Sequence, residues 1–299
     1  MRSDALDPGR YLAARRRLVE RALARRFPPR GPALRRAIRY SLLGGGKRLR
    51  PILALAAGEV AGAPPPTVLP FACALEVVHT YSLVHDDLPA MDDDDLRRGR
   101  PTSHKVFGEG TAILVGDALL TEAFGLMAGA RNVAPVRVLA AIAELARAAG
   151  EVGMVGGQAL DLAAAGRPAT LAAIRAIHRR KTGALFTAAV RVGALVAGAR
   201  PTLLRRLTRY GEQLGLCFQI ADDIADAVEA GDGRTDRALG KATYPALLGM
   251  ERSRAHAERA RDAALDAVAP LGSRAEPLRA IATLVVAQID APAVLARTG

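Results

Sequence analysis

The 299-residue chain contains no tryptophan, two cysteines and only 4% aromatic residues. The scarcity of aromatics, together with abundant alanine, leucine and arginine, favours helix over sheet. Cys73 and Cys217 lie in apolar stretches with neither CxxC nor Cys/His spacing around them, which excludes a zinc site of the usual pattern. We therefore expect both cysteines to be buried, reduced thiols.

The chain also lacks a long uninterrupted apolar run. No window reaches the ~18 consecutive apolar residues of a membrane span. The first residues include early acids and no apolar core of signal-peptide type. These absences predict a soluble, cytoplasmic protein with no stable membrane insertion.

Acidic residues are outnumbered, with 30 Asp and Glu against 42 Lys and Arg, and the formal net charge is +12. A charge of this sign is compatible with nucleic-acid binding. The arginines, however, are scattered along predicted helices and are not interleaved with aromatic residues. We expect no nucleic-acid partner; the alternative, a basic helical nucleic-acid binder, would show steep salt dependence and no need for magnesium.

Helix-period segments separated by a few Pro- and Gly-rich breakers occupy most of the chain, and no strand-period alternation of useful length is present. The clearest predicted helices are 67–85, 110–130, 134–149, 171–181 and 203–230. The last is apolar over much of its surface, as a helix inside a bundle must be. No linker or composition shift divides the sequence. We predict an all-α fold in which residues 1–299 form a single multi-helix domain.

Six of the thirty acidic residues crowd into positions 86–95 of this basic chain. The run follows the predicted helix 67–85, which should end here because Pro89 disfavours its continuation. Apolar helical sequence on either side argues against a solvated acidic tail. Like charges this close need a cation, and carboxylates without accompanying His or Cys ligands indicate magnesium rather than zinc.

A second cluster, Asp222, Asp223 and Asp226, lies inside the predicted helix 203–230. On a helical wheel these three residues and Gln219 fall within about 100° of arc, so we expect them to form one polar face that looks into a cavity. A buried salt-bridge network is the alternative. It is the weaker one because no Lys or Arg stands at helical i+4 spacing from the aspartates.

Three compact basic patches accompany the acids. Lys47 and Arg50 follow three consecutive glycines, Arg97 and Arg98 follow the first acidic run, and the third patch spans 178–181. Glycine lets backbone N–H groups approach an anion, and arginine matches phosphate oxygens with its bidentate fork. Two acidic clusters and three basic patches describe a site for two phosphorylated substrates.

Five motifs together resemble the trans-isoprenyl diphosphate synthases, or polyprenyl synthetases. They are Gly45-Gly46-Lys47-Arg48-Leu49-Arg50-Pro51, Asp86-Asp87-x4-Asp92 with Arg97-Arg98, Gly157-Gln158-Ala159-Leu160-Asp161, Lys181-Thr182-Gly183, and Phe218-Gln219-x2-Asp222-Asp223-x2-Asp226. Within that family the chain is most similar to the bacterial farnesyl diphosphate synthases. The match runs from about Tyr40 to about Gly249, and residues 1–35 and 270–299 add little.

The resemblance implies a helical bundle with a central substrate cavity, a requirement for Mg²⁺ and a homodimer. It implies a reaction in which isopentenyl diphosphate is added to dimethylallyl or geranyl diphosphate to give farnesyl diphosphate, a step of isoprenoid biosynthesis.

The resemblance also implies a role for each matching residue. The implied Mg²⁺ ligands are Asp86, Asp92 and Asp222, supported by Asp87 and Asp226. The implied allylic diphosphate clamp is Arg97, Lys181 and Lys241. Isopentenyl diphosphate would be held by Lys47, Arg50, Arg98 and His79, which lies two helical turns before Asp86. Thr182 and Gln219 would bind substrate facing the developing cation, and Tyr81 and Ser82 would form the floor that sets chain length.

The chain departs from the family pattern in two places. The loop after Asp226 is shorter than usual and has Arg234 where a lysine is expected, which puts the lid over the allylic diphosphate in doubt. The C-terminal basic residues that often help to close the site are reduced to Arg297.

Three other activities fit parts of the pattern: a geranylgeranyl diphosphate synthase, a class I terpene cyclase, and a non-catalytic regulatory subunit that kept the fold. A cyclase would not need Lys47, Arg50 and His79 for a second diphosphate. A regulatory subunit would be expected to lose its aspartates, and here all are present. Product length stays open between farnesyl and geranylgeranyl diphosphate.

Overall fold

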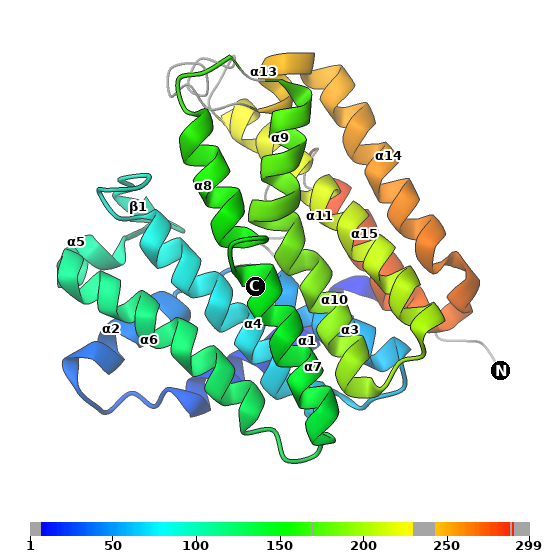
Figure 1. Cartoon of the computed structure of the whole chain (residues 1–299), viewed down its shortest axis with the longest axis horizontal. Coiled ribbons are helices and arrows are strands. Elements are labelled where there is room, and N and C mark those ends of the chain that lie inside the picture. The colour runs from blue at the N-terminus through cyan, green and yellow to red at the C-terminus, as the bar shows by residue number, and fades with distance from the viewer. Residues whose placement is uncertain (1–6, 169, 230–242, 288, 290–299) are drawn as a thin grey trace.

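A computed structural model describes residues 7–168, 170–229, 243–287 and 289, and helices make up most of this part of the chain (Figure 1). In chain order the elements are α1 (Pro8–Arg26), α2 (Ala33–Leu42), α3 (Leu49–Val60), α4 (Pro65–Asp86), β1 (Leu96–Arg97), β2 (Arg100–Pro101), α5 (Ser103–Phe107), α6 (Glu109–Ala128), α7 (Pro135–Ala149), α8 (Met154–Ala164), α9 (Leu171–His178), the π-helical turn η1 (Arg179–Gly183), α10 (Ala184–Ala197), α11 (Pro201–Glu229), α13 (Tyr244–Leu248), α14 (Met250–Val268), the 3₁₀ segment η2 (Ala269–Ala275) and α15 (Glu276–Ala287). The predicted all-α fold is confirmed.

Four predicted helices appear as α4, α6, α7 and α11, with bounds that differ from the prediction by at most two residues. Three of them begin at a proline, Pro65, Pro135 and Pro201. Proline suits the first helical turn because its missing N–H has no intrahelical partner there. Helix α4 ends at Asp86, as Pro89 predicted, so the first aspartates stand at a helix terminus.

Two local features differ from the sequence prediction. The helix expected over 171–181 stops at His178, and the chain continues as the π-helical turn η1. The segment after the first acidic run forms a short antiparallel hairpin in which Leu96 pairs with Pro101 and Arg97 with Arg100. Its two-residue turn, Arg98-Gly99, has positive φ at both positions, which is the geometry of a tight hairpin. Strands of two residues are too short to show a period of two in sequence.

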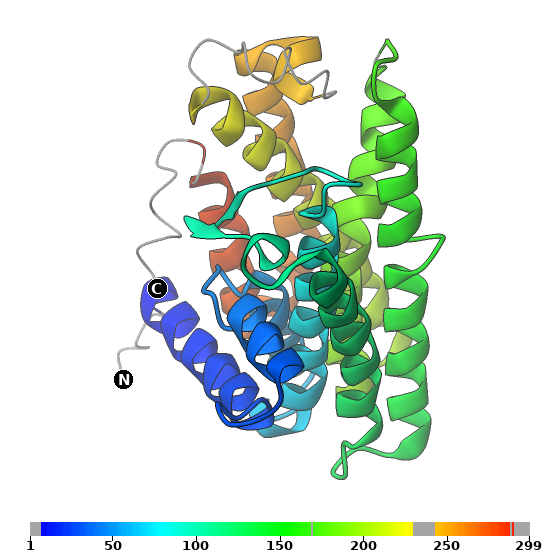
Figure 2. The same ribbon diagram turned by 90° about the vertical axis from the view of Figure 1, so that its left-hand side faces the viewer.

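The core is formed where α10 packs against α3, α4, α7 and α11. Gly193 of α10 lies so close to the backbone of Ala54 and Gly58 in α3 that no side chain could fit between them. Helices α1 and α2 lie on one side of the bundle, and α7 and α8 follow each other along the other side (Figure 2). Cys73 and Cys217 are buried and free, as predicted, and burial raises the pKa of each thiol to about 12. The central position of α10 sets the spacing of α4 and α11, the helices that carry the two aspartate clusters.

Helices α4 and α6 are long and apolar enough to cross a membrane by length and composition alone. In α4 the most apolar window is 67% buried, as expected for a helix that runs through the core of the bundle. In α6 the corresponding window is only 33% buried. Helix α6 therefore presents apolar surface that nothing in the described protomer covers.

Candidate active site

A cavity of about 1250 Å³ lies among α3, α4, α6, α8, η1 and α11. It is larger than the roughly 300–1,000 Å³ of an ordinary small-molecule pocket. The predicted site residues that line it are Lys47, Arg50, His79, Tyr81, Ser82, Asp86, Asp92, Arg97, Arg98, Lys181, Thr182, Gln219 and Asp222. Asp87 and Asp226 are not among its lining residues. Lys241 lies outside the described residues, as do Arg234 and Arg297.

The first aspartate cluster enters the cavity through a turn that follows α4. The amide of Asp92 donates to the carbonyl of Asp86 at 2.8 Å, which brings the two carboxylates to the same wall. The pKa of Asp86 is raised to about 6, mainly by burial; Asp92 and Asp87 contribute to the rise, while Lys181 and Arg97 oppose it. The site thus holds Asp86 in an environment that disfavours its charge until a cation is present.

Asp87 points away from the cavity and positions Arg97. The residue is 3% exposed, and its carboxylate accepts two hydrogen bonds from Arg97, from Nε at 2.8 Å and from Nη2 at 2.6 Å. Asp94 accepts a further bond from the same guanidinium at 2.6 Å. Arg97 still lines the cavity, so Asp87 fixes the direction of a cavity-lining cation. Its implied role as a supporting metal ligand is therefore not matched by its position.

The second cluster divides between two environments, contrary to the single polar face that the helical wheel predicted. Gln219 and Asp222 line the cavity, and Asp226 is exposed. Asp223 is buried, accepting from Gln219 Nε2 at 3.0 Å and from the amide of Tyr244 at 3.1 Å, and burial raises its pKa to about 7. A helical wheel cannot show that Tyr244 of α13 covers Asp223 at one edge of that face.

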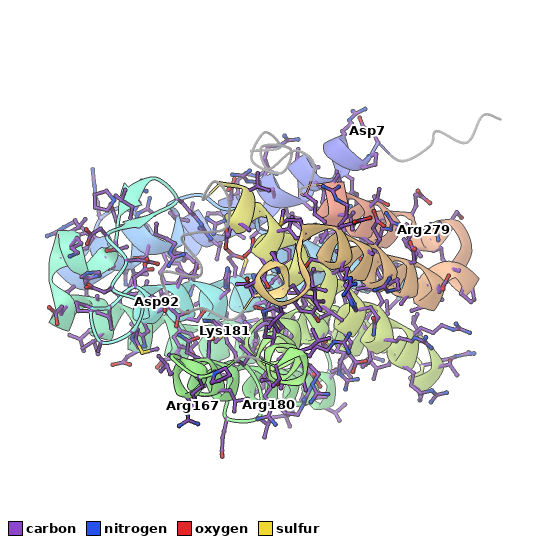
Figure 3. All side chains as sticks on the ribbon, turned by 90° about the horizontal axis from the view of Figure 1, so that it is seen from above. Asp7, Asp92, Arg167, Arg180, Lys181 and Arg279 are labelled. Carbon is purple, nitrogen blue, oxygen red and sulfur yellow. The ribbon has the colours of Figure 1, made fainter. Side chains whose placement is uncertain are left out.

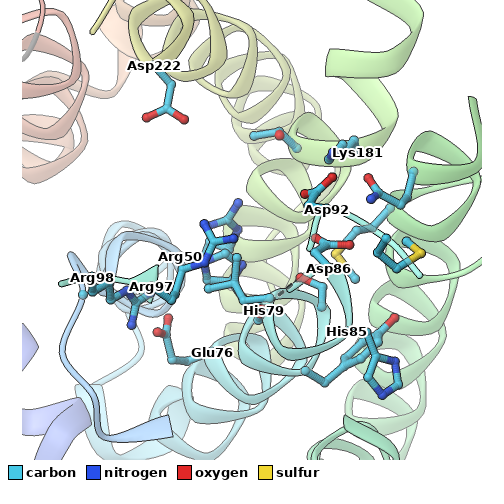
Figure 4. A pocket seen from close by; sticks show the side chains of 18 of the residues that line it. Arg50, Glu76, His79, His85, Asp86, Asp92, Arg97, Arg98, Lys181 and Asp222 are labelled. Atoms are coloured by element: carbon cyan, nitrogen blue, oxygen red, sulfur yellow. Dashed lines mark hydrogen bonds between the residues drawn. The ribbon is translucent and has the colours of Figure 1, made fainter. Parts of the chain in front are cut away.

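The aspartates from the two clusters face each other across the cavity, with Asp86 and Asp92 on one wall and Asp222 on the other (Figure 4). Within the described parts of the chain, no group of three His, Cys, Asp or Glu side chains is close enough to hold an ion without help. Carboxylate oxygens are the ligands that Mg²⁺ prefers, and Mg²⁺ is commonly completed by substrate phosphates. The donors therefore fit Mg²⁺ ions shared with a diphosphate lying between the walls.

Lys181 and Thr182 reach the cavity from the π-helical turn. Lys181 Nζ pairs with Asp161 of α8 at 2.6 Å, and Lys181 lies close to Asp92 (Figures 3 and 4). A Cβ at Gly157 of α8 would lie 2.6 Å from the Cα of Lys181, so this glycine lets α8 approach the turn. A π-turn is common at functional sites because its extra residue redirects side chains. Asp161 belongs to the motif of residues 157–161, but nothing in the sequence indicated its role as the partner of Lys181.

Thr182 is oriented by a chain of hydrogen bonds to α11. Its hydroxyl donates to Gln219 Oε1 at 2.6 Å, and Gln219 in turn donates to Asp223. Because the hydroxyl hydrogen is engaged by Gln219, the oxygen lone pairs of Thr182 remain available to the cavity. Two neutral dipoles, with no ionised nucleophile on either side chain, therefore border this part of the cavity.

The basic end of the cavity is built on the glycine loop and the start of α3. Gly45, Gly46 and Arg48 all have positive φ, and Arg98 packs on Gly46 where a Cβ would lie 2.6 Å from Nη2. Arg48 is buried in an ion pair with Glu76 at 2.5 Å. This loop therefore brings the N-terminus of α3, with its free N–H groups, to the cavity wall, an arrangement that favours an anion.

Two phenylalanines support the cations of this end. The guanidinium of Arg50 lies 4.9 Å from the ring centre of Phe186, and Lys47 Nζ lies 5.8 Å from that of Phe218. Burial lowers the pKa of Arg50 to about 10, so it stays charged at neutral pH. Phe186 is a contributor that the sequence did not single out, since an aromatic in an apolar helix usually signals core packing.

His79 lines the same end of the cavity as a neutral imidazole. Its pKa is held well below 6.5, first by burial and then by Arg50, Arg98, Arg48 and Arg97. A neutral imidazole can donate one hydrogen bond to a phosphate oxygen without adding another positive charge beside the neighbouring arginines. The predicted basic residues thus converge here, and His79 contributes as a hydrogen-bonding group.

Comparison with known proteins agrees with this geometry. The polyprenyl synthetase family matches residues 31–269, a longer span than the motifs alone covered. The chain belongs to the polyprenyl synthetase family. It is 51% identical over 249 residues to the farnesyl diphosphate synthase of Escherichia coli, covering 80% of this chain and 82% of that protein. It is 46% identical over 281 residues to a heterodimeric geranylgeranyl pyrophosphate synthase large subunit of Arabidopsis thaliana, covering 87% of this chain and 76% of that protein.

Among solved structures, the fold is similar to that of an FPP/GFPP synthase from Zymomonas mobilis, with a TM-score of 0.86, 39% identity, and 94% of this chain and 99% of that one covered. The chain is therefore a short-chain trans-prenyltransferase of the isoprenoid synthase fold. The family implies isopentenyl diphosphate and an allylic diphosphate as substrates, and the cavity has basic side chains for both. Relatives at similar identity include both farnesyl and geranylgeranyl diphosphate synthases.

Proposed function

We propose that this prenyltransferase is an Mg²⁺-dependent farnesyl diphosphate synthase that adds isopentenyl diphosphate to dimethylallyl and geranyl diphosphate. The observation that carries the proposal is the position of Tyr81, a bulky aromatic that is 7% exposed and lines the cavity near Asp86. A ring in this place limits the room for a growing tail. A geranylgeranyl diphosphate synthase is the alternative, supported by relatives of that name at similar identity.

In the proposed reaction the allylic diphosphate leaves while an allylic carbocation forms. Lys181 and Arg97 bind oxygens of the departing diphosphate, where negative charge grows, and this stabilises the transition state more than the ground state. Mg²⁺ held by Asp86, Asp92 and Asp222 would supply the same kind of charge stabilisation. The Thr182 oxygen and the Gln219 carbonyl face the cation as dipoles. They stabilise it without trapping it covalently.

The second substrate is held by the basic end of the cavity. Lys47, Arg50 and Arg98 bind the diphosphate of isopentenyl diphosphate, with neutral His79 as a further donor. This fixes the isopentenyl double bond beside the allylic carbon, which replaces a bimolecular encounter by an oriented one. Water must be kept out because it competes with the double bond for the cation. The released diphosphate can accept the proton that is lost afterwards.

The proposal is tested by incubating the purified protein with Mg²⁺, isopentenyl diphosphate and each allylic starter, followed by mass identification of the products. We expect farnesyl diphosphate as the main product and no reaction after removal of divalent ions by a chelator. Geranylgeranyl diphosphate as the main product would support the alternative. Absence of any condensation would exclude both.

Replacement of Tyr81 by alanine is expected to move the main product from farnesyl to geranylgeranyl diphosphate. The change removes a ring that lines the cavity, and we expect the space that it leaves to admit one more five-carbon unit. Tyr81→Phe is the matched control because it keeps the ring and should keep the product. Chromatography of the dephosphorylated alcohols measures the shift, and farnesol as the sole product of an active Tyr81→Ala enzyme would show that another wall sets the length.

We also propose a homodimer that covers the exposed apolar face of α6 and α7. Leu114, Val136 and Leu139 on this face are 56%, 71% and 66% exposed. Light scattering should give about twice the 31.3 kDa of the chain. Leu114→Arg combined with Leu139→Arg should yield monomer, because charge in an apolar interface is costly. Leu247→Arg on α13, outside this face, is the control, and a wild-type monomer at micromolar concentration would contradict the proposal.

A further inference from the structure

The last turn of α4 carries an imidazole next to Tyr81. His85 follows Tyr81 by four residues, so both lie on one side of the helix. Their rings meet edge to face, with centres 5.8 Å apart and an interplanar angle of 84°. Both side chains line the cavity. Tyr81 is therefore supported on one edge by a second aromatic group.

Gly116 of α6 is where that imidazole is seated. A Cβ at this position would lie within 2.6 Å of three atoms of the His85 ring, so only glycine leaves room for it. His85 Nε2 lies 3.0 Å from the carbonyl oxygen of Ile113, which can only accept, so Nε2 carries the hydrogen. Close packing and this hydrogen bond hold the ring on α6, turned away from the carboxylate of Asp86 (Figure 4).

This seat lies where the cavity meets α6. Ile113 lines the cavity and is 46% exposed, so beyond Tyr81 the cavity borders the surface of α6. Tyr81 is five residues from Asp86, which is about 7.5 Å along the helix axis. His85 is only one residue from Asp86, about 1.5 Å along the axis, so a tail that starts at a diphosphate near Asp86 and runs along α4 passes the level of His85 before it reaches that of Tyr81.

We propose that His85, held against Gly116, is a positioning residue that fixes the Tyr81 ring and so limits the length of the tail. The inference rests on the proposed function and deepens it, because it assigns product length to a contact between two helices. The imidazole packs edge to face on the Tyr81 ring and fills the space between α4 and Gly116 of α6. Without it, the Tyr81 ring can turn aside and the tail extends past it.

The test compares wild type, His85→Ala, Gly116→Ala and the double variant as purified proteins. Two readouts are taken, the ratio of C20 to C15 alcohols made in the product assay, and the ratio of calorimetric affinities for geranylgeranyl and farnesyl diphosphate with Mg²⁺. The binding ratio remains measurable if a change beside Asp86 slows turnover. Gly125→Ala is the matched control, since a Cβ there meets nothing within 4 Å in the protomer. Circular dichroism verifies folding, and His85→Ser serves as a second truncation.

We expect His85→Ala to raise both ratios by about 10-fold or more. In an apolar pocket, a difference of one methylene between two substrates changes the preference for one over the other by about 10- to 200-fold. Gly116→Ala should lower both ratios when His85 is present, since the methyl pushes the ring towards the cavity. It should change them less than about twofold when residue 85 is alanine, because no ring is left to push.

The inference is overturned if both truncations of His85 leave the two ratios as in wild type, or if Gly116→Ala has the same effect in both backgrounds. In either case a wild type that makes farnesyl diphosphate leaves the proposed function standing. A wild type that neither condenses the substrates nor binds the two prenyl diphosphates removes the proposed function, and the inference with it.

Discussion

Asp86→Ala and Asp222→Ala are each expected to lower turnover by ~10³-fold or more while the helical fold is retained. The two carboxylates stand on opposite walls of the cavity, and each would hold a cation used most strongly as the diphosphate leaves. Steady-state rates at saturating Mg²⁺ measure the loss. Folding should survive, because burial already disfavours the charge of Asp86, and its removal takes away an unfavourable term.

Asp95→Ala is the matched control for these variants. Asp95 belongs to the same acidic run, but its side chain is exposed and pairs with Lys105 at 2.7 Å outside the cavity. Its loss should leave turnover within about twofold of wild type, since exposed ion pairs contribute little. Near-normal product formation by Asp86→Ala or Asp222→Ala would refute the two-cluster mechanism, and a large loss in Asp95→Ala would show that the whole run acts together.

Lys47→Ala and Arg50→Ala are expected to raise KM for isopentenyl diphosphate by about 10- to 100-fold, the range for losing a hydrogen bond to a charged group. Lys181→Ala should instead weaken the allylic substrate. The reason is position: Lys47 and Arg50 lie on the phenylalanine pair at the basic end, whereas Lys181 pairs with Asp161 and lies near Asp92. Initial rates with one substrate varied and the other saturating separate the two effects.

Lys105→Ala provides the control for charge alone, because Lys105 is an exposed cation whose only described ion-pair partner is Asp95. It should leave both Michaelis constants unchanged. If Lys47, Arg50 and Lys181 affected both substrates equally, the cavity would hold its two diphosphates in a shared field of charge, and the assignment of separate ends would be wrong.

Most of the fold and much of the candidate site could be predicted from the sequence alone. Helix α4 and its end at Asp86 follow from apolar periodicity and Pro89, which are local properties. The five motifs supplied most of the charged residues that line the cavity, although Arg16 and Glu76 line it from outside the motifs. The hairpin at 96–101 and the π-turn at 179–183 were not predictable, since each is too short to leave a period.

The role of each residue within a motif was harder to predict from the sequence. Asp86 and Asp87 are neighbours in sequence, yet one faces the cavity and the other binds Arg97 behind it. Asp222 and Asp223 divide in the same way, because the amide of Tyr244 reaches Asp223 from another helix. In a run of identical residues, the sequence does not show which side chain points into the cavity. That is decided by the elements packed on each side.

By itself, the sequence determined the helical fold class, the types of ligand atom available, and the family to which the chain belongs, because these depend on local period, composition and motif order. Only the tertiary structure decided that Phe186 supports Arg50, that Gly116 leaves room for His85, and that Asp87 and Asp223 lie outside the cavity that Asp86 and Asp222 line. These contacts join residues that are distant in the chain. They arise from how closely α3, α4, α6, α10 and α11 pack, and no local pattern in the sequence encodes that spacing.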